Sequence, residues 1–183
     1  MIKAFQQNDI SFSSNGDITI APLKAYVYKT VSGSLYLNLE CSLDYLDFIV
    51  PQNIIVANTP QGDQAFRITS MQKSRSKIKA TCKHIFYDSE NYLIADSYVV
   101  DKNCNDALDH LNNAADNTSP FTTISDVQTI NSFRCVRKSL CEAIETVLER
   151  WGGHLVRNNW NIEIRETIGN DNGVVIQYKK NLK

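Results

Sequence analysis

Groups able to act as metal ligands, bases or nucleophiles are sparse in this sequence. The histidines are His84, His110 and His154. Cys82 precedes the first of them by two residues, and a thiol with an imidazole at that spacing could ligate a metal or form a nucleophile and its base. Residues two apart share one face of a strand, and Ile78 and Ala80 extend that face. Packing in a core is therefore the favoured interpretation of Cys82 and His84.

Two further pairs of side chains could cooperate. Asp44 and Asp47 could serve as paired carboxylates, but nothing in the sequence would separate their pKa values, so a polar loop between strands is favoured. Asp106 and His110 lie at positions i and i+4 of a predicted helix, where a surface ion pair contributes ~0.3–0.5 kcal/mol. A metal would need further ligands, and none lies nearby in the sequence.

Sequence motifs that mark catalysis are also missing. The chain has no Gly-x-Ser-x-Gly elbow, no His-Glu-x-x-His helix and no Gly-x-x-x-x-Gly-Lys loop. Its cysteines are odd in number and never form Cys-x-x-Cys, which favours reduced and mostly buried thiols. They are Cys41, Cys82, Cys104, Cys135 and Cys141. We therefore predict no catalytic, cofactor-binding or metal-ligating residues, no cofactor and no small-molecule substrate, and hence a protein that is not an enzyme.

One basic cluster could bind a polyanion. Lys73, Arg75, Lys77 and Lys79 alternate with other residues, so a strand here could present a cationic face along which single-stranded nucleic acid could lie. No aromatic residue is interleaved with them, and hairpin tips commonly carry lysines that block pairing between sheet edges. A solvated hairpin tip is favoured, and a nucleic-acid-binding barrel stays a competing hypothesis.

Length, composition and charge limit the number of domains and the kinds of partner that this chain can have. The chain has 183 residues, of which 43% are hydrophobic, and 19 basic residues against 20 acidic ones give a net charge of −1. This charge creates no global field that would recruit nucleic acid or an anionic membrane. The apolar runs are far shorter than the ~20 residues needed to cross a bilayer, and the first residues lack the apolar region of a secretory signal. We expect one or two domains with a packed core and a partner recognised by shape.

The first hundred residues carry the period-two pattern of antiparallel strands. Ile18 and Ile20 alternate with polar neighbours. Tyr26 and Tyr28 with their flanks follow, and after Ser32 and Gly33 comes a strictly alternating run of Leu35, Leu37, Leu39 and Cys41. The Ser-Gly pair between two such runs supplies the turn of a β-hairpin predicted over residues 18–42. Further strands are predicted around residues 54–56, 66–68 and 78–82, with turns at 60–63 and 74–76. Five or more strands without an intervening helix favour a closed or nearly closed antiparallel β-barrel. We predict a barrel-like domain over residues 1–100.

Residues 101–183 change to an α+β pattern with two helices. The first helix is capped by Asn103 or Asn105 and ends at residues 117–120. Its predicted buried face consists of Ala107, Leu108, Leu111, Ala114 and Ala115. The second helix begins with a capping box formed by Ser139 and Glu142. Its apolar stripe ends at Trp151, and Gly152 then terminates the helix.

A β-meander is expected after the second helix. Val156 pairs with a strand containing Trp160, Ile162 and Ile164 across a two-residue turn at Asn158 and Asn159. A polar loop over residues 169–173 leads to a last strand over residues 174–178. The whole chain is therefore predicted to be α+β and mainly β, with a second domain over residues 101–183.

Several segments together resemble the N-terminal region of the phage minor structural protein family, also known as the prophage endopeptidase tail or tail-associated lysin family. The resemblance covers most of the chain and rests on short motifs in the same order. They lie at residues 32–40, 66–68, 84–88, 151–153, 160–164 and 173–182. The resemblance implies a baseplate hub-like fold in which a barrel domain is followed by an α+β domain.

The resemblance also implies a function. Members of this family form the central hub of the tail tip or baseplate in long-tailed phages, as homotrimers whose barrels continue the ring of the tail tube. The expected partners are further copies of the chain and the distal tail, tail tube and tape measure proteins. The chain is then a virion component assembled in the bacterial cytoplasm, with no membrane or nucleic acid as partner.

Any peptidase or muramidase activity in this family belongs to a C-terminal extension. Related chains continue into a second barrel where this one stops, just after Asn181 and Leu182, so a fragment of a longer hub protein is expected. The alternative is the N-terminal part of a tail-associated peptidoglycan hydrolase whose catalytic domain is absent from this chain.

Overall fold

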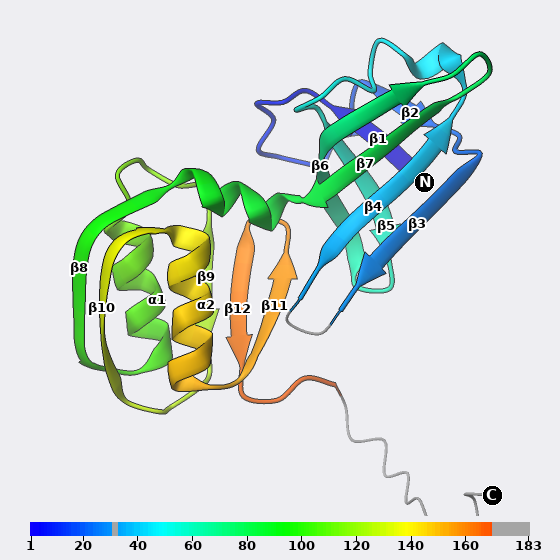
Figure 1. The fold of residues 1–183 in the computed structure, drawn as a ribbon. Coiled ribbons are helices and arrows are strands. Elements are labelled where there is room, and N and C mark those ends of the chain that lie inside the picture. Colours follow the sequence, from blue (N-terminus) through cyan, green and yellow to red (C-terminus); the bar gives the residue numbers. More distant parts are fainter. Residues whose placement is uncertain (31–32, 170–183) are drawn as a thin grey trace, which may run out of the picture.

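Three β-sheets and two α-helices make up the part of the chain that this computed structural model describes, residues 1–30 and 33–169 (Figure 1). This arrangement confirms the predicted α+β, mainly β fold class. The strand predicted over residues 174–178, most of the loop before it, and Ser32 of the first hairpin lie outside the described residues. None of the described helices is long and apolar enough to cross a membrane.

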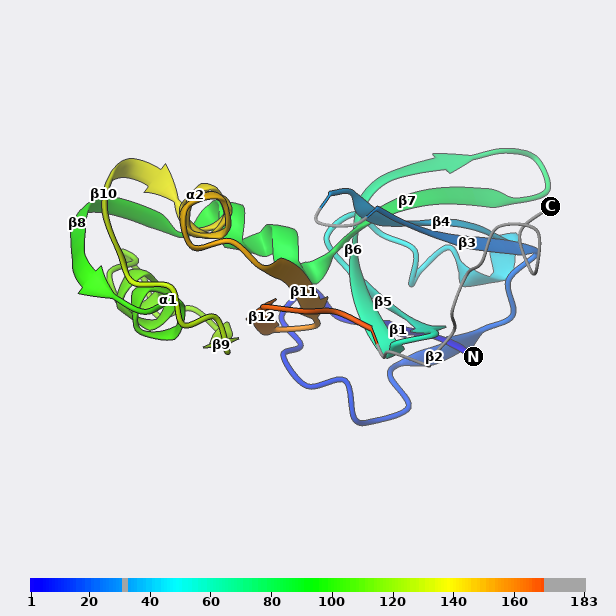
Figure 2. The ribbon, with the colours of Figure 1, turned by 90° about the horizontal axis from the view of Figure 1, so that it is seen from below.

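The largest sheet has seven strands in the order β2-β1-β5-β6-β7-β4-β3, and every neighbouring pair is antiparallel. It curls into a half-barrel (Figure 2). Its strands are β1 (Ile2–Phe5), β2 (Ile18–Ile20), β3 (Lys24–Lys29), β4 (Leu35–Cys41), β5 (Ile54–Thr59), β6 (Gly62–Lys73) and β7 (Ile78–His84). A short 3₁₀ helix (Leu43–Tyr45) lies between β4 and β5.

The predicted hairpin over residues 18–42 is correct for the two runs beside its turn and wrong in including residues 18–20. β3 and β4 do form a hairpin, with Tyr28 opposite Tyr36, but β2 pairs with β1, a strand that the sequence did not indicate. Pro22 lies between β2 and β3 and has no N–H to donate to a ladder. Residues 21–23 span at most about 14 Å between the two strands, so the curl brings the opposite edges of the sheet near each other. Among the described residues no ladder joins β2 to β3.

The inner face of the half-barrel follows the predicted alternation. Leu35, Leu37, Leu39 and Cys41 of β4 are buried, while the residues between them are half-buried or exposed. On β7, Ile78, Ala80, Cys82 and His84 are buried in the same way. Period-two patterning therefore located the core of this sheet because one face of each strand packs inward.

The rest of the described chain forms two small sheets with two helices. Its elements are the 3₁₀ helix η2 (Ile85–Asn91), β8 (Leu93–Lys102), α1 (Cys104–Asn113), β9 (Thr122–Ser125), β10 (Asn131–Ser139), α2 (Leu140–Trp151), β11 (His154–Asn158) and β12 (Asn161–Arg165). β8 and β10 form an antiparallel pair, whereas β12 pairs with β11 antiparallel and with β9 parallel. β8 runs across residue 100, where a domain boundary was predicted, and the division into two domains stays a prediction.

Both helices pack one face into a shared core. Asn103 caps α1, because its Oδ1 accepts a hydrogen bond from the Asp106 N–H at 2.9 Å, and the helix ends at Asn113, before the predicted stop. The capping box of α2 is present as predicted: the Glu142 N–H donates to Ser139 Oγ at 3.2 Å, and the Ser139 N–H donates to Glu142 Oε2 at 2.9 Å. Local hydrogen bonding therefore fixes where each helix begins.

We expect the Ser139→Ala variant to lose about 1 kcal/mol of unfolding free energy, because the Glu142 N–H loses its acceptor. Urea unfolding followed by circular dichroism measures this loss. Ser76→Ala is the matched control, since this exposed hydroxyl at the β6–β7 turn makes no hydrogen bond to any described residue. Equal stability of the two variants would contradict a stabilising role for the capping box.

Two glycines connect α2 to β11, and only one of them is tightly enclosed. Gly152 and Gly153 both have positive φ, 81° and 93°. A Cβ on Gly153 would lie 2.8 Å from the Arg165 carbonyl oxygen and 2.9 Å from Val127 Cγ2, whereas a Cβ on Gly152 would meet nothing within 4 Å. The turn therefore brings the chain against β12 at Gly153.

Gly153→Ala is expected to destabilise the fold by roughly 2–3 kcal/mol through backbone strain together with overpacking. Gly152→Ala carries the strain alone, because a φ of 81° with a ψ of −167° lies in a region used almost only by glycine, and it should cost less, about 1–2 kcal/mol. Thermal unfolding of the two variants measures the difference. The same loss at both positions would show that β12 can move away from Gly153 at no cost.

Candidate functional site

The histidine and cysteine that could have formed a metal or catalytic pair are buried core residues. His84 Nδ1 accepts a hydrogen bond from the Phe86 N–H at 3.1 Å, and His84 Nε2 lies 3.0 Å from Gln64 Oε1, so Nε2 carries the proton. Burial, with smaller effects from Arg157 and Lys29, lowers the pKa of His84 to about 3. Burial raises the pKa of Cys82 to about 12. A neutral imidazole and a protonated thiol are structural groups here.

The remaining candidate residues are not brought together. Asp44 Oδ2 accepts a hydrogen bond from Ser42 Oγ at 2.8 Å in the 3₁₀ helix after β4, as a polar connection would. Asp106 takes part in the α1 cap, and within residues 1–30 and 33–169 it makes no ion pair with His110. The same part of the chain contains no group of three or more His, Cys, Asp or Glu side chains that could hold a metal.

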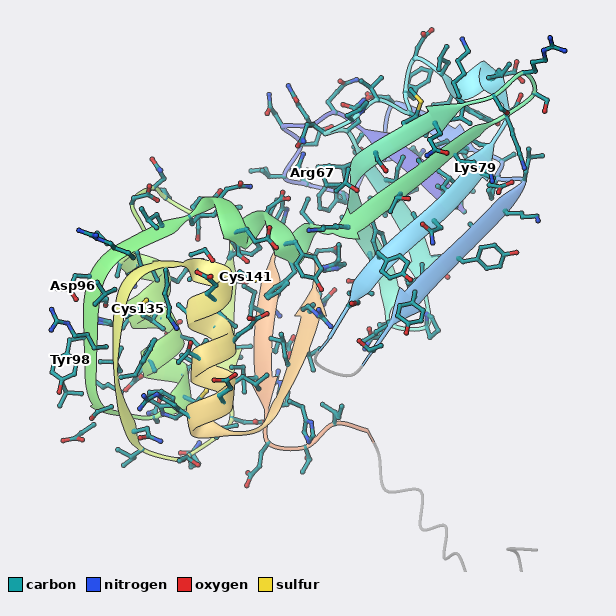
Figure 3. The ribbon with its side chains drawn as sticks, in the orientation of Figure 1. Arg67, Lys79, Asp96, Tyr98, Cys135 and Cys141 are labelled. Carbon is teal, nitrogen blue, oxygen red and sulfur yellow. The ribbon has the colours of Figure 1, made fainter. Side chains whose placement is uncertain are left out.

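All five cysteines are buried free thiols, as predicted. Burial is the main cause of the raised pKa in each of them, and it raises the pKa of Cys141 to about 11. Figure 3 shows Cys135 on β10 and Cys141 on α2, and both belong to the core that the two helices share. Thiols in this state react slowly with oxidants and electrophiles.

The basic cluster lies on the hairpin of β6 and β7, with Lys79 on β7 (Figure 3). The Ser74 N–H donates to the Lys77 carbonyl at 2.9 Å and closes the tip. Lys77 Nζ lies 2.6 Å from one Glu40 oxygen, and Lys79 Nζ lies 3.5 Å from the other. The Lys77 hydrogen bond is the main reason that the pKa of Glu40 is lowered. One carboxylate therefore balances part of the charge that a polyanion would meet.

The turn between β11 and β12 is hydrogen-bonded to β6. Asn158 pairs with Asn161, so the β11–β12 turn consists of Asn159 and Trp160, one residue later than predicted. Asn159 has a φ of 52° and its Oδ1 accepts from the Ala65 N–H at 2.7 Å, while its Nδ2 donates to the Asp63 carbonyl at 3.0 Å. The Asn159 side chain thus provides β6 with the hydrogen bonds that a neighbouring strand would supply.

Arg157 is a buried cation that the sequence did not single out. It is 2% exposed, its guanidinium lies 5.5 Å from the Phe86 ring centre, and its Nη1 donates to the Gly33 carbonyl and, at 3.1 Å, to Tyr87 Oη. Its Nε and Nη2 have no hydrogen-bond partner among the described residues. Arg157 therefore holds together the β3–β4 loop, η2 and β11.

A polar cleft of about 370 Å³ lies beside this junction and contains the ion pair of Arg67 and Asp88. Arg67, which is labelled in Figure 3, has its Nη2 2.6 Å from Asp88 Oδ2, and its Nη1 donates to the Gln7 and Gln52 carbonyls at 3.0 and 2.6 Å. Trp160 lines the same cleft and donates from Nε1 to the Ile10 carbonyl at 2.9 Å. Arg67 and Asp88 neutralise each other's charge. The hydrogen bonds from Arg67 and Trp160 attach the N-terminal loop, through the Gln7 and Ile10 carbonyls, to β6 and to the β11–β12 turn.

β3 forms one of the two edges of the seven-stranded sheet, the other being β2, and all of its residues are exposed. Tyr26 is 62% exposed and Tyr28 is 50% exposed, with the Tyr28 ring stacked on Tyr36 at 5.0 Å between centres. Such an edge presents unpaired backbone N–H and C=O groups. Aromatic rings beside a free edge are suited to pairing with another strand.

The second exposed surface is the outer ribbon, which consists of β8 and β10. Tyr98, Val100 and Val136 on its outward side are all between 46% and 60% exposed. Arg134 on β10 pairs with Asp96 on β8 at 2.7 Å, and Figure 3 shows Asp96 and Tyr98 on the outer side of the ribbon. The outer edge of β8 has no strand partner in the described part of the chain.

No protein-family model and no curated protein matches the sequence, but solved structures share the fold. The chain is similar to the prophage tail protein gp18 from Listeria monocytogenes EGD-e, with a TM-score of 0.68 and 12% identity. It is also similar to the 43 kDa tail protein of prophage MuSo2 from Shewanella oneidensis, with a TM-score of 0.52 and 12% identity. The matches cover 85% and 82% of this chain but only 47% and 56% of those proteins, so this chain spans about half of their length.

Proposed function

We propose that the protein is a structural component of a phage or prophage tail, placed in the tail tip or baseplate hub. There it links the tail tube to distal fibres or to a lytic domain, as a homotrimer in contact with the distal tail, tube and tape measure proteins. The observation that carries this proposal is the fold shared with two prophage tail proteins over 82–85% of the chain. It is supported by the ordered motifs in the sequence and by the sheet edges at β3 and β8, which have no further strand partner among the described residues.

Antibody labelling of purified tails tests the proposed location. Tails from particles of the phage that encodes the chain are labelled with gold and viewed by electron microscopy, with a capsid antibody as control. We expect label at the tail tip. Label confined to the shaft or the capsid, or purified tails from which the chain is missing, would overturn the proposal.

The family resemblance also supports a second candidate, the N-terminal part of a tail-associated peptidoglycan hydrolase. A zymogram on bacterial cell walls separates the two functions, with the 183-residue chain and the product of the complete reading frame run side by side. We expect no clearing by this chain, because its candidate nucleophile and base are a buried thiol and a neutral buried imidazole. Clearing by the longer product alone would assign the activity to residues beyond this chain.

A further inference from the structure

Two free strand edges in this protein carry opposite charges at the same spacing. β3 reads Lys-Ala-Tyr-Val-Tyr-Lys from Lys24 to Lys29. Within β8, the six residues from Asp96 to Asp101 read Asp-Ser-Tyr-Val-Val-Asp. Each segment has a charge at its first and sixth positions, a small residue at the second, and aromatic or β-branched residues at the third to fifth. The two segments are therefore complementary in charge and similar in β-forming character.

One copy of the chain cannot pair these two edges with each other. β3 lies at one end of the molecule and β8 at the other in both views (Figures 1 and 2). β3 is hydrogen-bonded only to β4, and β8 only to β10, among the strands of the described chain. Any pairing between β3 and β8 must therefore join different copies.

We propose that β3 of one copy pairs with β8 of the next copy in a head-to-tail contact, an interface that deepens the proposed tail function and rests on it. In a parallel alignment Lys24 lies beside Asp96, and Lys29 lies opposite Asp101, which has a φ of 48° where the register of β8 with β10 shifts. The same alignment places Tyr26 beside Tyr98, two rings that are 62% and 60% exposed in the single chain. A head-to-tail contact generates a closed ring when the rotation between copies returns to the start.

Charge disfavours the contacts that two identical edges would make. A β3–β3 contact would place lysines beside lysines, and a β8–β8 contact would place aspartates beside aspartates, whichever way the strands run. Asp96 is already paired with Arg134, but the two side chains are 52% and 64% exposed. Exchanging such an exposed partner for Lys24 loses little, because solvent screens the existing pair.

Charge reversal with rescue tests the contact. Lys24→Glu with Lys29→Glu, and Asp96→Lys with Asp101→Lys, should each reduce the oligomer to monomer mass in light scattering and sedimentation. The chain carrying all four reversals should regain the wild-type mass, because its edges are again complementary. Lys73→Glu with Arg75→Glu at the exposed hairpin tip is the control and should leave the mass unchanged. If the chain with all four reversals is folded by circular dichroism but does not regain the wild-type mass, the proposed contact is wrong.

Disulfide trapping tests the same contact when the oligomer is weak. The five native thiols are buried, so chains with Tyr26→Cys and chains with Tyr98→Cys each expose one reactive thiol. Mixing the two under oxidising conditions should give a covalent dimer containing one of each, distinguished by tags of different size. Absence of this dimer in the mixture, or equal dimer formation by Tyr26→Cys alone, would overturn the proposal.

The gold labelling of tails does not depend on this interface, so the two proposals can fail separately. Label at the tail tip with an oligomer that ignores all four charge reversals would overturn the β3–β8 contact and leave the tail function standing. A monomer that gives no cross-link, as expected if other residues of the same chain cover β3, would overturn the contact as well. Rescue by the four reversals in a protein missing from tails would overturn the tail function.

Discussion

Replacing Trp151 by alanine is expected to lower the free energy of unfolding by about 3–5 kcal/mol, the largest effect of any single substitution considered. Trp151 is 3% exposed at the end of α2, and its Nε1 donates to the Lys102 carbonyl oxygen at 2.9 Å. Truncation leaves a cavity in the core that the two helices share and removes the hydrogen bond to the Lys102 carbonyl at the end of β8. Urea unfolding monitored by circular dichroism measures the loss.

Trp151→Phe separates the two contributions. The smaller ring retains most of the packing and removes the hydrogen bond, so we expect a loss of about 1–2 kcal/mol. A loss below about 1 kcal/mol for Trp151→Ala would contradict docking of α2 through this side chain.

Acid should destabilise the protein through His84, with an effect that grows over a defined pH range. The unfolded chain takes up a proton on this imidazole near pH 6.5, whereas the buried side chain has a pKa of about 3. Its contribution to stability is therefore complete above pH 6.5 and is lost as the pH falls towards 3. The expected slope is about 1.4 kcal/mol per pH unit, because the unfolded state binds one more proton in this range.

The His84→Asn variant isolates this effect from the carboxylates that also titrate in acid. Asparagine preserves an acceptor for the Phe86 N–H but does not take up a proton. Below pH 6 the stability of the variant should fall less steeply than that of wild type, by about 1.4 kcal/mol per pH unit. Nuclear magnetic resonance gives a direct check, since an imidazole signal of His84 that titrates near pH 6.5 in the folded protein would contradict this burial.

Features of the fold that depend on neighbouring residues were predictable from the sequence. The alternation of Leu35, Leu37 and Leu39 indicated β4, because one face of the strand meets the core over its whole length. Ser139 and Glu142 indicated the start of α2, because both partners of the capping box lie within one turn. The burial of Cys82 and His84 followed from the same periodicity.

Features that depend on distant residues were not predictable. β2 pairs with β1, and no local pattern chooses between that partner and β3. The position of the β11–β12 turn depends on the Ala65 N–H, which Asn159 meets from 94 residues away in the sequence. Arg157 occupies a buried position of β11 because two aromatic rings and a loop carbonyl enclose it, and its residue type alone suggests an exposed one. The free edges at β3 and β8 likewise became visible only with the sheet order.

The hydrogen bonds between Asn159 and β6 can form only late in translation. All seven strands of the half-barrel are complete by residue 84, yet the Ala65 N–H receives its acceptor only after Asn159 has been translated. A nascent chain therefore leaves the Ala65 N–H and the Asp63 carbonyl without these partners while some 75 further residues emerge, a span of about 4–15 s at typical translation rates. Until Asn159 arrives, this part of β6 can hydrogen-bond to another extended segment, which is the hazard that unpaired strand groups carry.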